Sequence, residues 1–254
     1  MSIIRFSTVY GCISAWVYCN LCRGSILKVR IVNKVSTKTR EEIAEAYSSS
    51  PWWYDIRGFL ILTFAYRSTL GAQIRLFGGN IGNRHLEVAI GTGTLYSYID
   101  RWRRWKRMPQ AEVSGIDYAE PMLAGAMKRF ANRPDIELRH ADVAALTYDD
   151  NTFDTVNIAN AVHCFPDVDA GFRDVFRVLK PGGRLAANVL LYPRGPQPLK
   201  WIAQKIDDWG MRKGILYTPY EQDAIRQRLE QAGFVIESEQ VAGNTYNVIA
   251  LKPR

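Results

Sequence analysis

The residues best suited to chemistry lie in a short segment between two apolar runs. Gly91 and Gly93 flank Thr92 directly after the apolar run 86–90. Glycines at these positions remove the side chains that would keep a ligand away from the backbone. Glu87 lies inside the run, where a carboxylate is costly to bury unless it has a partner. The segment is typical of a buried strand that turns sharply into a helix beside a bound ligand.

Further polar groups follow later apolar runs. Asp117, Asp142 and Asn160 each come directly after such a run, and His163 follows Asn160 closely. Asp117 lies 24 residues past Gly93, where an acid commonly accepts hydrogen bonds from ribose hydroxyls. His163 has two open interpretations. It is a general base for a substrate hydroxyl or amine, or a residue at a helix start that bonds to the backbone.

The elements that position these residues follow from the pattern after residue 84. Short apolar runs alternate with amphipathic segments, which predicts a parallel sheet with helices on both faces. Ligands bind such sheets beyond the carboxyl ends of the strands. The last two runs lack a long helix between them, so a hairpin is expected to place one antiparallel strand at the sheet edge. The expected strands cover residues 86–90, 112–116, 136–140, 153–159, 184–190, 234–240 and 246–251. The expected helices cover residues 94–105, 121–130, 168–179 and 221–232.

These elements predict an α/β fold. It is a doubly wound, Rossmann-like, seven-stranded and mostly parallel sheet whose last strand is antiparallel. The chain of 254 residues is long enough for one large domain of this kind with extensions. Three parts are expected: a basic extension over 1–36, a helical cap segment over 37–80 and the main domain over 81–254.

The charge is distributed unevenly. Residues 1–40 hold seven of the 33 basic residues and none of the 25 acidic ones, so the rest of the chain is nearly neutral despite a net charge of +8. No nucleic-acid partner is therefore expected. The extension is open to three interpretations: a membrane anchor or contact, a cleaved or disordered leader, and a stretch without a structural role.

The cysteines indicate neither a metal site nor a disulfide framework. Cys19 and Cys22 in the extension have no second pair and no nearby His, so no metal is expected. A reducing compartment is the default, and we expect a cytoplasmic protein whose membrane association depends on the extension. The oligomeric state stays open.

Aromatic residues suggest where a substrate would lie. Trp53 and Tyr54 either form a lid over an apolar acceptor or pack in the core. Tyr192 leads into a variable segment that is a candidate to close over the substrate. Residues 101–107 read Arg-Trp-Arg-Arg-Trp-Lys-Arg. This basic run either contacts an anionic membrane or is a solvated helix end, where cations are favoured by the helix dipole.

Taken together, these segments resemble the class I S-adenosylmethionine-dependent methyltransferases, near the ubiquinone/menaquinone-biosynthesis (methyltransferase type 11) group. The resemblance covers about residues 84–190, fades before residue 37 and is thin between 192 and 216. The segments that carry it are Leu86-Glu87-Val88-Ala89-Ile90-Gly91-Thr92-Gly93, Gly115-Ile116-Asp117-Tyr118-Ala119-Glu120-Pro121-Met122-Leu123, Ala141-Asp142-Val143, Phe153-Asp154-Thr155-Val156, Arg177-Val178-Leu179-Lys180-Pro181-Gly182-Gly183-Arg184-Leu185 and Ala232-Gly233-Phe234.

The resemblance implies S-adenosylmethionine as the cofactor and assigns a role to each matching residue. The glycine loop would contact the methionine portion, Glu87 would orient the loop or the ammonium group, and Asp117 would bind the ribose hydroxyls. Ala89 stands where many relatives carry glycine, and its methyl group is expected to fit. Position 96 is tyrosine, which argues against a dinucleotide site. The implied cofactor-binding set is Glu87, Ala89, Gly91, Thr92, Gly93, Asp117, Tyr118, Met122, Asp142, Val143 and Asn160.

The resemblance makes 81–254 a methyltransferase domain. We expect methyl transfer to an O, N or C nucleophile of a small, lipophilic or aromatic metabolite, with His163 as the catalytic candidate. Positioning the acceptor in line with the sulfonium methyl is the main task. The alternative is an S-adenosylmethionine-binding protein without methylation activity, either a regulatory subunit or a catalyst that uses the sulfonium charge in another reaction.

Overall fold

The computed structural model describes residues 7–9, 12–14, 68–195, 197–198, 200–205, 208 and 220–254. The chain divides into two units, Met1–Thr37 and Lys38–Arg254. In the first unit, β1 (Ser7–Val9) and β2 (Cys12–Ser14) pair antiparallel, with Thr8 opposite Ile13. No helix in the described part of the chain is long and apolar enough to cross a membrane.

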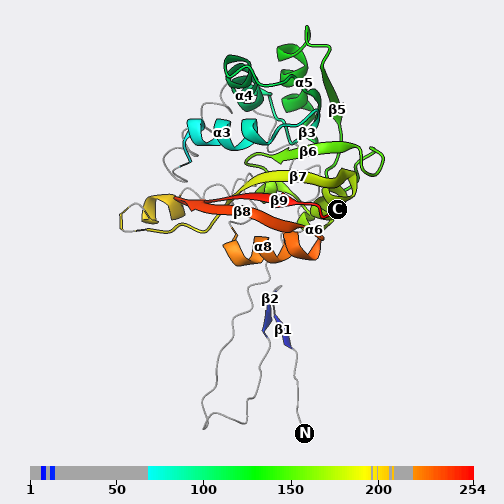
Figure 1. The fold of residues 1–254 in the computed structure, drawn as a ribbon. Helices are drawn as coiled ribbons and strands as arrows, with labels where there is room; N and C mark the ends of the chain where they lie inside the picture. The colour runs from blue at the N-terminus through cyan, green and yellow to red at the C-terminus, as the bar shows by residue number, and fades with distance from the viewer. Residues whose placement is uncertain are drawn as a thin grey trace. The chain divides into compact units, whose positions relative to one another are not determined.

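The second unit contains a seven-stranded sheet in the order β5-β4-β3-β6-β7-β9-β8 (Figure 1). Five neighbouring strands run parallel, and β9 is antiparallel to both of its neighbours. The predicted fold class is therefore confirmed, including the antiparallel last strand. The expected edge position of that strand is wrong, because β8 returns along the outer side of β9 and becomes the edge itself. The strands are β3 (Arg84–Val88), β4 (Glu112–Asp117), β5 (Ile136–His140), β6 (Phe153–Ile158), β7 (Leu179–Leu190), β8 (Val235–Ala242) and β9 (Thr245–Leu251).

Helices cover both faces of the sheet (Figure 1). One face packs against α3, α4 and α5 through a core that includes Phe77, Ile99 and Phe130. The other packs against α6 and α8 through a larger core that includes Phe172, Leu229 and Tyr246. Burying apolar area on both faces explains why the strands are continuous apolar runs. The helices are α3 (Leu70–Asn80), α4 (Thr94–Trp105), α5 (Glu120–Arg129), α6 (Val168–Val178), α8 (Gln222–Gln231) and the single 3₁₀ turn η1 (Val162–Cys164).

Most predicted boundaries agree with these elements to within one or two residues. The exception is β7, which begins at Leu179 rather than at residue 184. Its early part follows the end of α6, and Leu179 already pairs with Phe153 of β6. Of the predicted cap segment, 37–80, the structure describes the residues from 68 onward. These residues include α3, which ends at Asn80.

The strand register brings polar residues together on one face of the sheet. His85 lies opposite Thr155, and Glu87 lies opposite Asn157. Because side chains alternate along a strand, these residues share the face covered by α3 and α4, whereas Leu86 and Val88 belong to the core on the other face. An otherwise apolar sheet therefore carries a buried polar cluster beside the glycine loop.

Candidate cofactor site at the carboxyl edge of the sheet

The loop between β3 and α4 has an unusual backbone. Ala89, Gly91 and Gly93 have positive φ values of 55°, 61° and 73°. Left-handed backbone is strained for an L-residue but not for glycine, so Ala89 holds a conformation that glycine would adopt without strain. A Cβ at Gly91 would meet no atom of the described residues within 4 Å, so these residues leave the backbone at Gly91 open to a ligand.

Gly93 has a packing reason as well. A Cβ there would lie 2.3 Å from Cε2 of Phe130, a residue at the end of α5. The Arg129 side chain holds the same loop, since it donates to the Thr92 carbonyl at 2.9 Å and to the Thr94 hydroxyl at 2.7 Å. The loop is thus fixed from α5 in a shape that leaves Gly91 accessible.

Asp117 ends β4 and connects to the glycine loop directly. Its Oδ2 accepts the N–H of Gly91 at 2.7 Å, and its Oδ1 accepts the N–H of Ala119 at 2.8 Å. The side chain is buried, and this burial raises the pKa of the Asp117 carboxyl, while the backbone donors and His140 oppose the rise. No described cationic side chain forms an ion pair with it. The two backbone N–H groups therefore hold the carboxylate in place, and its remaining lone pairs can accept hydrogen bonds from a ligand.

Glu87 is the second buried carboxylate, and its exposed fraction is 3%. Its Oε1 accepts from Nε2 of His85 at 2.9 Å and from Nδ2 of Asn157 at 2.7 Å. Among the described residues no donor reaches its other oxygen, Oε2. His85 lies two residues before Glu87 on β3, and Asn157 lies opposite Glu87 on β6, so the sheet itself sets the position of the carboxylate.

His85 joins Glu87 to the neighbouring strand β6. The Thr155 hydroxyl oxygen accepts the Gly82 N–H at 2.8 Å and lies 2.8 Å from Nδ1 of His85. Nε2 of the same ring lies 2.9 Å from Oε1 of Glu87, so the imidazole links the Thr155 hydroxyl to the carboxylate. No Lys or Arg of the described residues forms an ion pair with Glu87.

A second network of hydrogen-bonded side chains starts at Asn160, directly after β6. Its Oδ1 accepts from Nδ2 of Asn188 at 2.7 Å, and its own Nδ2 donates to Oε1 of Gln73 at 2.8 Å. Gln73 in turn donates to the Ser68 hydroxyl at 3.1 Å. Asn160 has a positive φ of 53°, which these partners hold in place. Its amide group thus fixes the backbone beside the site and ties it to α3.

His163 lies in η1 and is buried. Burial lowers the pKa of its imidazole to about 4, so the ring is neutral at physiological pH. Its Nδ1 has no hydrogen-bond partner among the described residues. A neutral, unpartnered imidazole nitrogen is able to accept a proton.

The remaining predicted residues fall around the same edge or outside it. Asp142 follows β5 and its Oδ1 accepts the Ala144 N–H at 2.9 Å. The Val143 and Met122 side chains are buried, with Val143 in the larger core. Tyr118 packs against the His140 ring at 5.3 Å. Tyr192 follows β7 and is 45% exposed, whereas Trp53 and Tyr54 lie outside the described residues.

Strand order therefore lines these groups up along one edge: Asp142 after β5, Asp117 after β4, the glycine loop after β3, then Asn160 and His163 after β6. The Ala141 N–H donates to the Asp117 carbonyl at 3.2 Å, which joins the first two. Sequence reasoning missed His85, Asn157, Gln73 and Asn188. A signal was present for the first two, because polar residues recur with the strand period at 85 and 87 and at 155 and 157.

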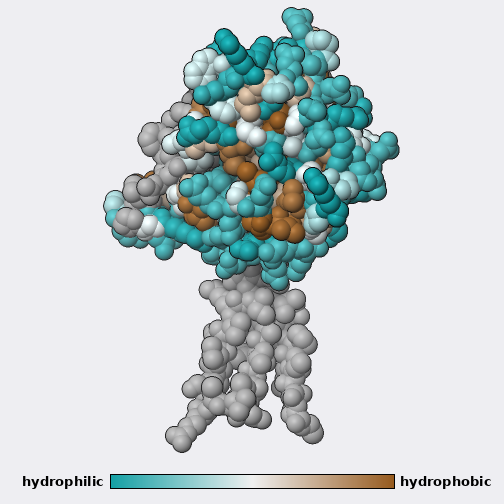
Figure 2. Space-filling view, viewed as in Figure 1, coloured by the Kyte–Doolittle hydropathy of each residue, from teal (hydrophilic) through white to brown (hydrophobic). Residues whose placement is uncertain are grey.

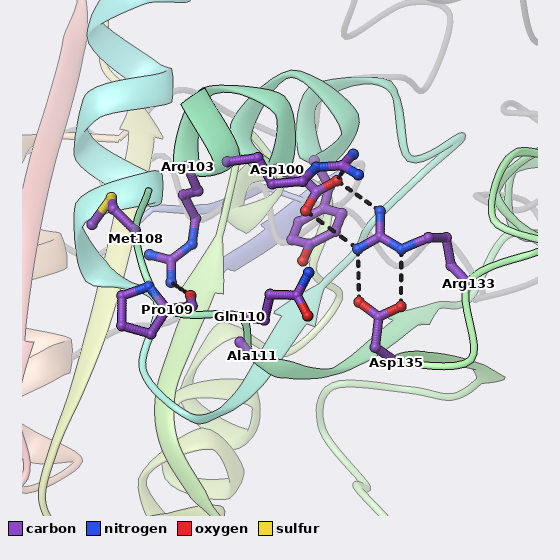
Figure 3. Close-up of a pocket in the computed structure, with 10 residues that line it drawn as sticks. Asp100, Arg103, Met108, Pro109, Gln110, Ala111, Arg133 and Asp135 are labelled. Atoms are coloured by element: carbon purple, nitrogen blue, oxygen red, sulfur yellow. Dashed lines mark hydrogen bonds and ion pairs between the residues drawn. The ribbon is translucent and has the colours of Figure 1, made fainter. Parts of the chain in front are cut away.

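The small pocket in Figure 3 lies at the opposite, amino edge of the sheet. Arg133 bridges two acids there, Asp100 at 2.7 Å and Asp135 at 2.7 Å. Arg103 donates to the carbonyls of Gly78 and Pro109, both at 2.7 Å. The Asp135 and Asp100 bonds raise the pKa of Arg133 well above its usual range. These charges already pair with one another, and the ion pairs beside the pocket tie α4 to the segment before β5.

The fold of this protein and the polar groups at the carboxyl edge of its sheet are those of the Rossmann-like class of S-adenosylmethionine-dependent methyltransferases. Residues 86–187 match the model of the family described as "Methyltransferase domain". A demethylmenaquinone methyltransferase of Staphylococcus aureus is 34% identical over 211 residues, which is 77% of this chain and 86% of the relative. The chain therefore belongs to the class I S-adenosylmethionine-dependent methyltransferase family, near its ubiquinone/menaquinone group.

Other relatives match over a shorter range. A demethylmenaquinone methyltransferase of Thermus thermophilus is 41% identical over 116 residues, which is 45% of this chain. That alignment spans about half (49%) of the Thermus protein. Among solved structures, a Haemonchus contortus phosphoethanolamine N-methyltransferase bound to S-adenosylhomocysteine has a TM-score of 0.59 at 15% identity, covering 79% of this chain and 58% of that one. At this identity the likeness concerns the fold.

Proposed function

We propose that the protein binds S-adenosylmethionine and transfers its methyl group to a carbon of a lipophilic, quinone-type aromatic acceptor. The observation that carries the cofactor is the pair of buried carboxylates at the carboxyl edge, Glu87 and Asp117, which form no ion pair with a Lys or Arg among the described residues. A carboxylate kept out of water without a cation is unfavourable unless a ligand compensates for it. The names of the two quinone-methylating relatives supply the acceptor class.

The residues present fit this cofactor. Its amino acid portion carries an ammonium group, which suits the negative charge of Glu87 and the open backbone at Gly91. Ribose hydroxyls are donors, and the second lone pairs of the Asp117 carboxylate accept them. Adenine would lie between Tyr118, Met122 and the segment Asp142–Val143. When bound, the cofactor supplies a methyl group on a sulfonium, which is already a good leaving group.

The protein's own contribution is to orient the acceptor and remove a proton. Attack by an aromatic carbon of the acceptor would form a C–C bond to the methyl group while the methyl–sulfur bond breaks and leaves a neutral thioether, and the same carbon would then lose its hydrogen as a proton. His163, neutral and with Nδ1 unpartnered among the described residues, is the proposed acceptor of that proton. Tyr192, Trp53 and Tyr54 are proposed to contact the acceptor.

Two measurements on the purified full chain test this function. Calorimetry with S-adenosylmethionine should give a saturable heat, and Asp117→Ala should weaken the binding about 100-fold. A methyl-release assay with a naphthoquinol that lacks its ring methyl should give a product heavier by about 14 mass units, one CH₂. Binding without any heavier product, also on O- and N-nucleophile acceptors, would favour the alternative of a non-methylating cofactor binder. Absence of binding would refute the proposal.

A further inference from the structure

The basic run at 101–107 divides into two sets of residues once α4 is seen in place. Arg103 is buried and donates to two backbone carbonyls. The Trp102 ring covers Gly78 of α3, where an added Cβ would come within 2.8 Å of it. Arg104 pairs with Asp100 at 2.5 Å. Arg103 and Trp102 hold α4 against the rest of the domain, whereas the Arg104–Asp100 pair lies within the helix.

The second set faces solvent. Trp105 is 73% exposed and Tyr98 is 44% exposed, and both are on the same side of α4 because seven residues make two helical turns. Arg101 lies on the adjacent stripe, one turn before Trp105, and Lys106 and Arg107 follow in the turn that ends the helix. We call Tyr98, Arg101, Trp105, Lys106 and Arg107 the α4 surface.

The cations of the α4 surface have no acidic partner among the described residues. Arg101, Lys106 and Arg107 are exposed and form no ion pair with any described residue. Lys106 instead places Nζ 4.5 Å from the centre of the Trp105 ring. The one acid on this helix, Asp100, is already bonded to Arg104 and Arg133. Hydrophilic residues dominate the region over α4 and α5 in Figure 2.

Three features of this surface favour a lipid bilayer as its partner. An indole and a phenol on one side of a helix reach the same depth when the helix lies along a bilayer, and both side chains prefer the headgroup region. Each unpaired cation near an anionic bilayer adds to the attraction. Single-stranded nucleic acid binds instead along basic grooves that follow its backbone. The α4 surface is the exposed side of a single helix and not a groove of this kind.

We propose that the α4 surface docks the protein on anionic membranes, with α4 parallel to the bilayer. The inference rests on exposure and charge alone and does not need the proposed methyl transfer. It also places membrane contact in the folded domain, separate from the basic extension.

Co-sedimentation of the full chain with vesicles tests the proposal. The wild type should bind vesicles of phosphatidylcholine with about 30% phosphatidylglycerol and not vesicles of phosphatidylcholine alone. The triple variant R101Q/K106Q/R107Q should bind about 100-fold more weakly, and Trp105→Ala about tenfold more weakly. Brominated lipid should quench wild-type tryptophan emission more than that of Trp105→Ala.

A matched control removes three exposed cations elsewhere, in R173Q/R226Q/R254Q. This variant has the same net charge as the test variant, so it should bind much more tightly than R101Q/K106Q/R107Q. Equal binding by the two triple variants would show that overall charge or the extension is responsible and would overturn the proposal. So would a loss of binding to a single-stranded RNA in R101Q/K106Q/R107Q while vesicle binding stays unchanged. Circular dichroism checks that each variant is folded.

Discussion

The two edges of the parallel sheet use charge in different ways. At the amino edge, Arg133 is clamped between Asp100 and Asp135. At the carboxyl edge, Asp117 and Glu87 are more deeply buried, yet their partners are backbone N–H groups, a histidine and an amide. The charges at the amino edge are already paired with one another. The carboxyl edge holds two buried carboxylates that pair with no Lys or Arg among the described residues.

This difference separates stability from function. Ion pairs that neutralise each other link α4 and β5 and need nothing from outside. A buried carboxylate without a cation costs free energy in the ligand-free protein, which a cationic ligand with donor groups can recover. The edge with the less favourable electrostatics is therefore the one to examine for binding, and variants at the two edges should separate affinity from stability.

The largest expected effect is on cofactor affinity at Asp117. Asp117→Ala removes both acceptor oxygens and the support of the Gly91 N–H, and we expect about 100-fold weaker binding of S-adenosylmethionine, or about 3 kcal/mol. Calorimetry measures it. The control is Asp135→Ala at the amino edge, which should bind the cofactor as the wild type does. Equal losses in both variants would contradict the division between the two edges.

The next effect is a pH dependence from His163. Its pKa is about 4 in the folded protein against 6.5 ordinarily, so the unfolded chain binds the proton more tightly. The contribution to stability is complete above pH 6.5 and is lost as pH falls toward 4, by about 2 kcal/mol between about pH 7 and pH 4.5. Urea unfolding at both pH values measures it. In His163→Gln this component should disappear, whereas His140→Gln should keep it.

Arg133→Met tests the amino edge directly. It leaves Asp135 partly buried without its cation and Asp100 with Arg104 alone, and we expect a loss of about 2 kcal/mol in the free energy of unfolding with unchanged cofactor affinity. Arg139→Met removes a more exposed pair with Glu137, two residues earlier on β5, and should cost less than about 0.5 kcal/mol. An Arg133→Met variant as stable as the wild type would show that the bridge contributes nothing.

A smaller loss of cofactor affinity than at Asp117 should come from Glu87→Gln, which removes the charge and keeps the acceptor for His85 and Asn157. We expect about tenfold weaker binding of S-adenosylmethionine, about 1.4 kcal/mol. Stability without ligand should be unchanged or higher, because a buried charge is gone. If the substitution destabilised the protein and left affinity intact, Glu87 would belong with the structural charges of the amino edge.

The local signals in the sequence proved informative about the strands and the loop. The boundaries of α4 and β5 agree with the prediction, because the hydrophobic period and the glycine turn are properties of contiguous residues. The β7 start was missed, because pairing with β6 extends the strand beyond its apolar part. The position of β9 inside the sheet was missed as well, since strand order depends on contacts between distant segments.

By itself, then, the sequence determined the alternation of elements, the glycine loop and the acids that follow the strands, since each is written in neighbouring residues. Only the tertiary structure decided which partner each charge receives. Asn157 meets Glu87 through the strand register, and Gln73 meets Asn160 across 87 positions of the chain. The physical reason is that hydrogen bonds and desolvation depend on distances in space, which strand pairing and helix packing set together.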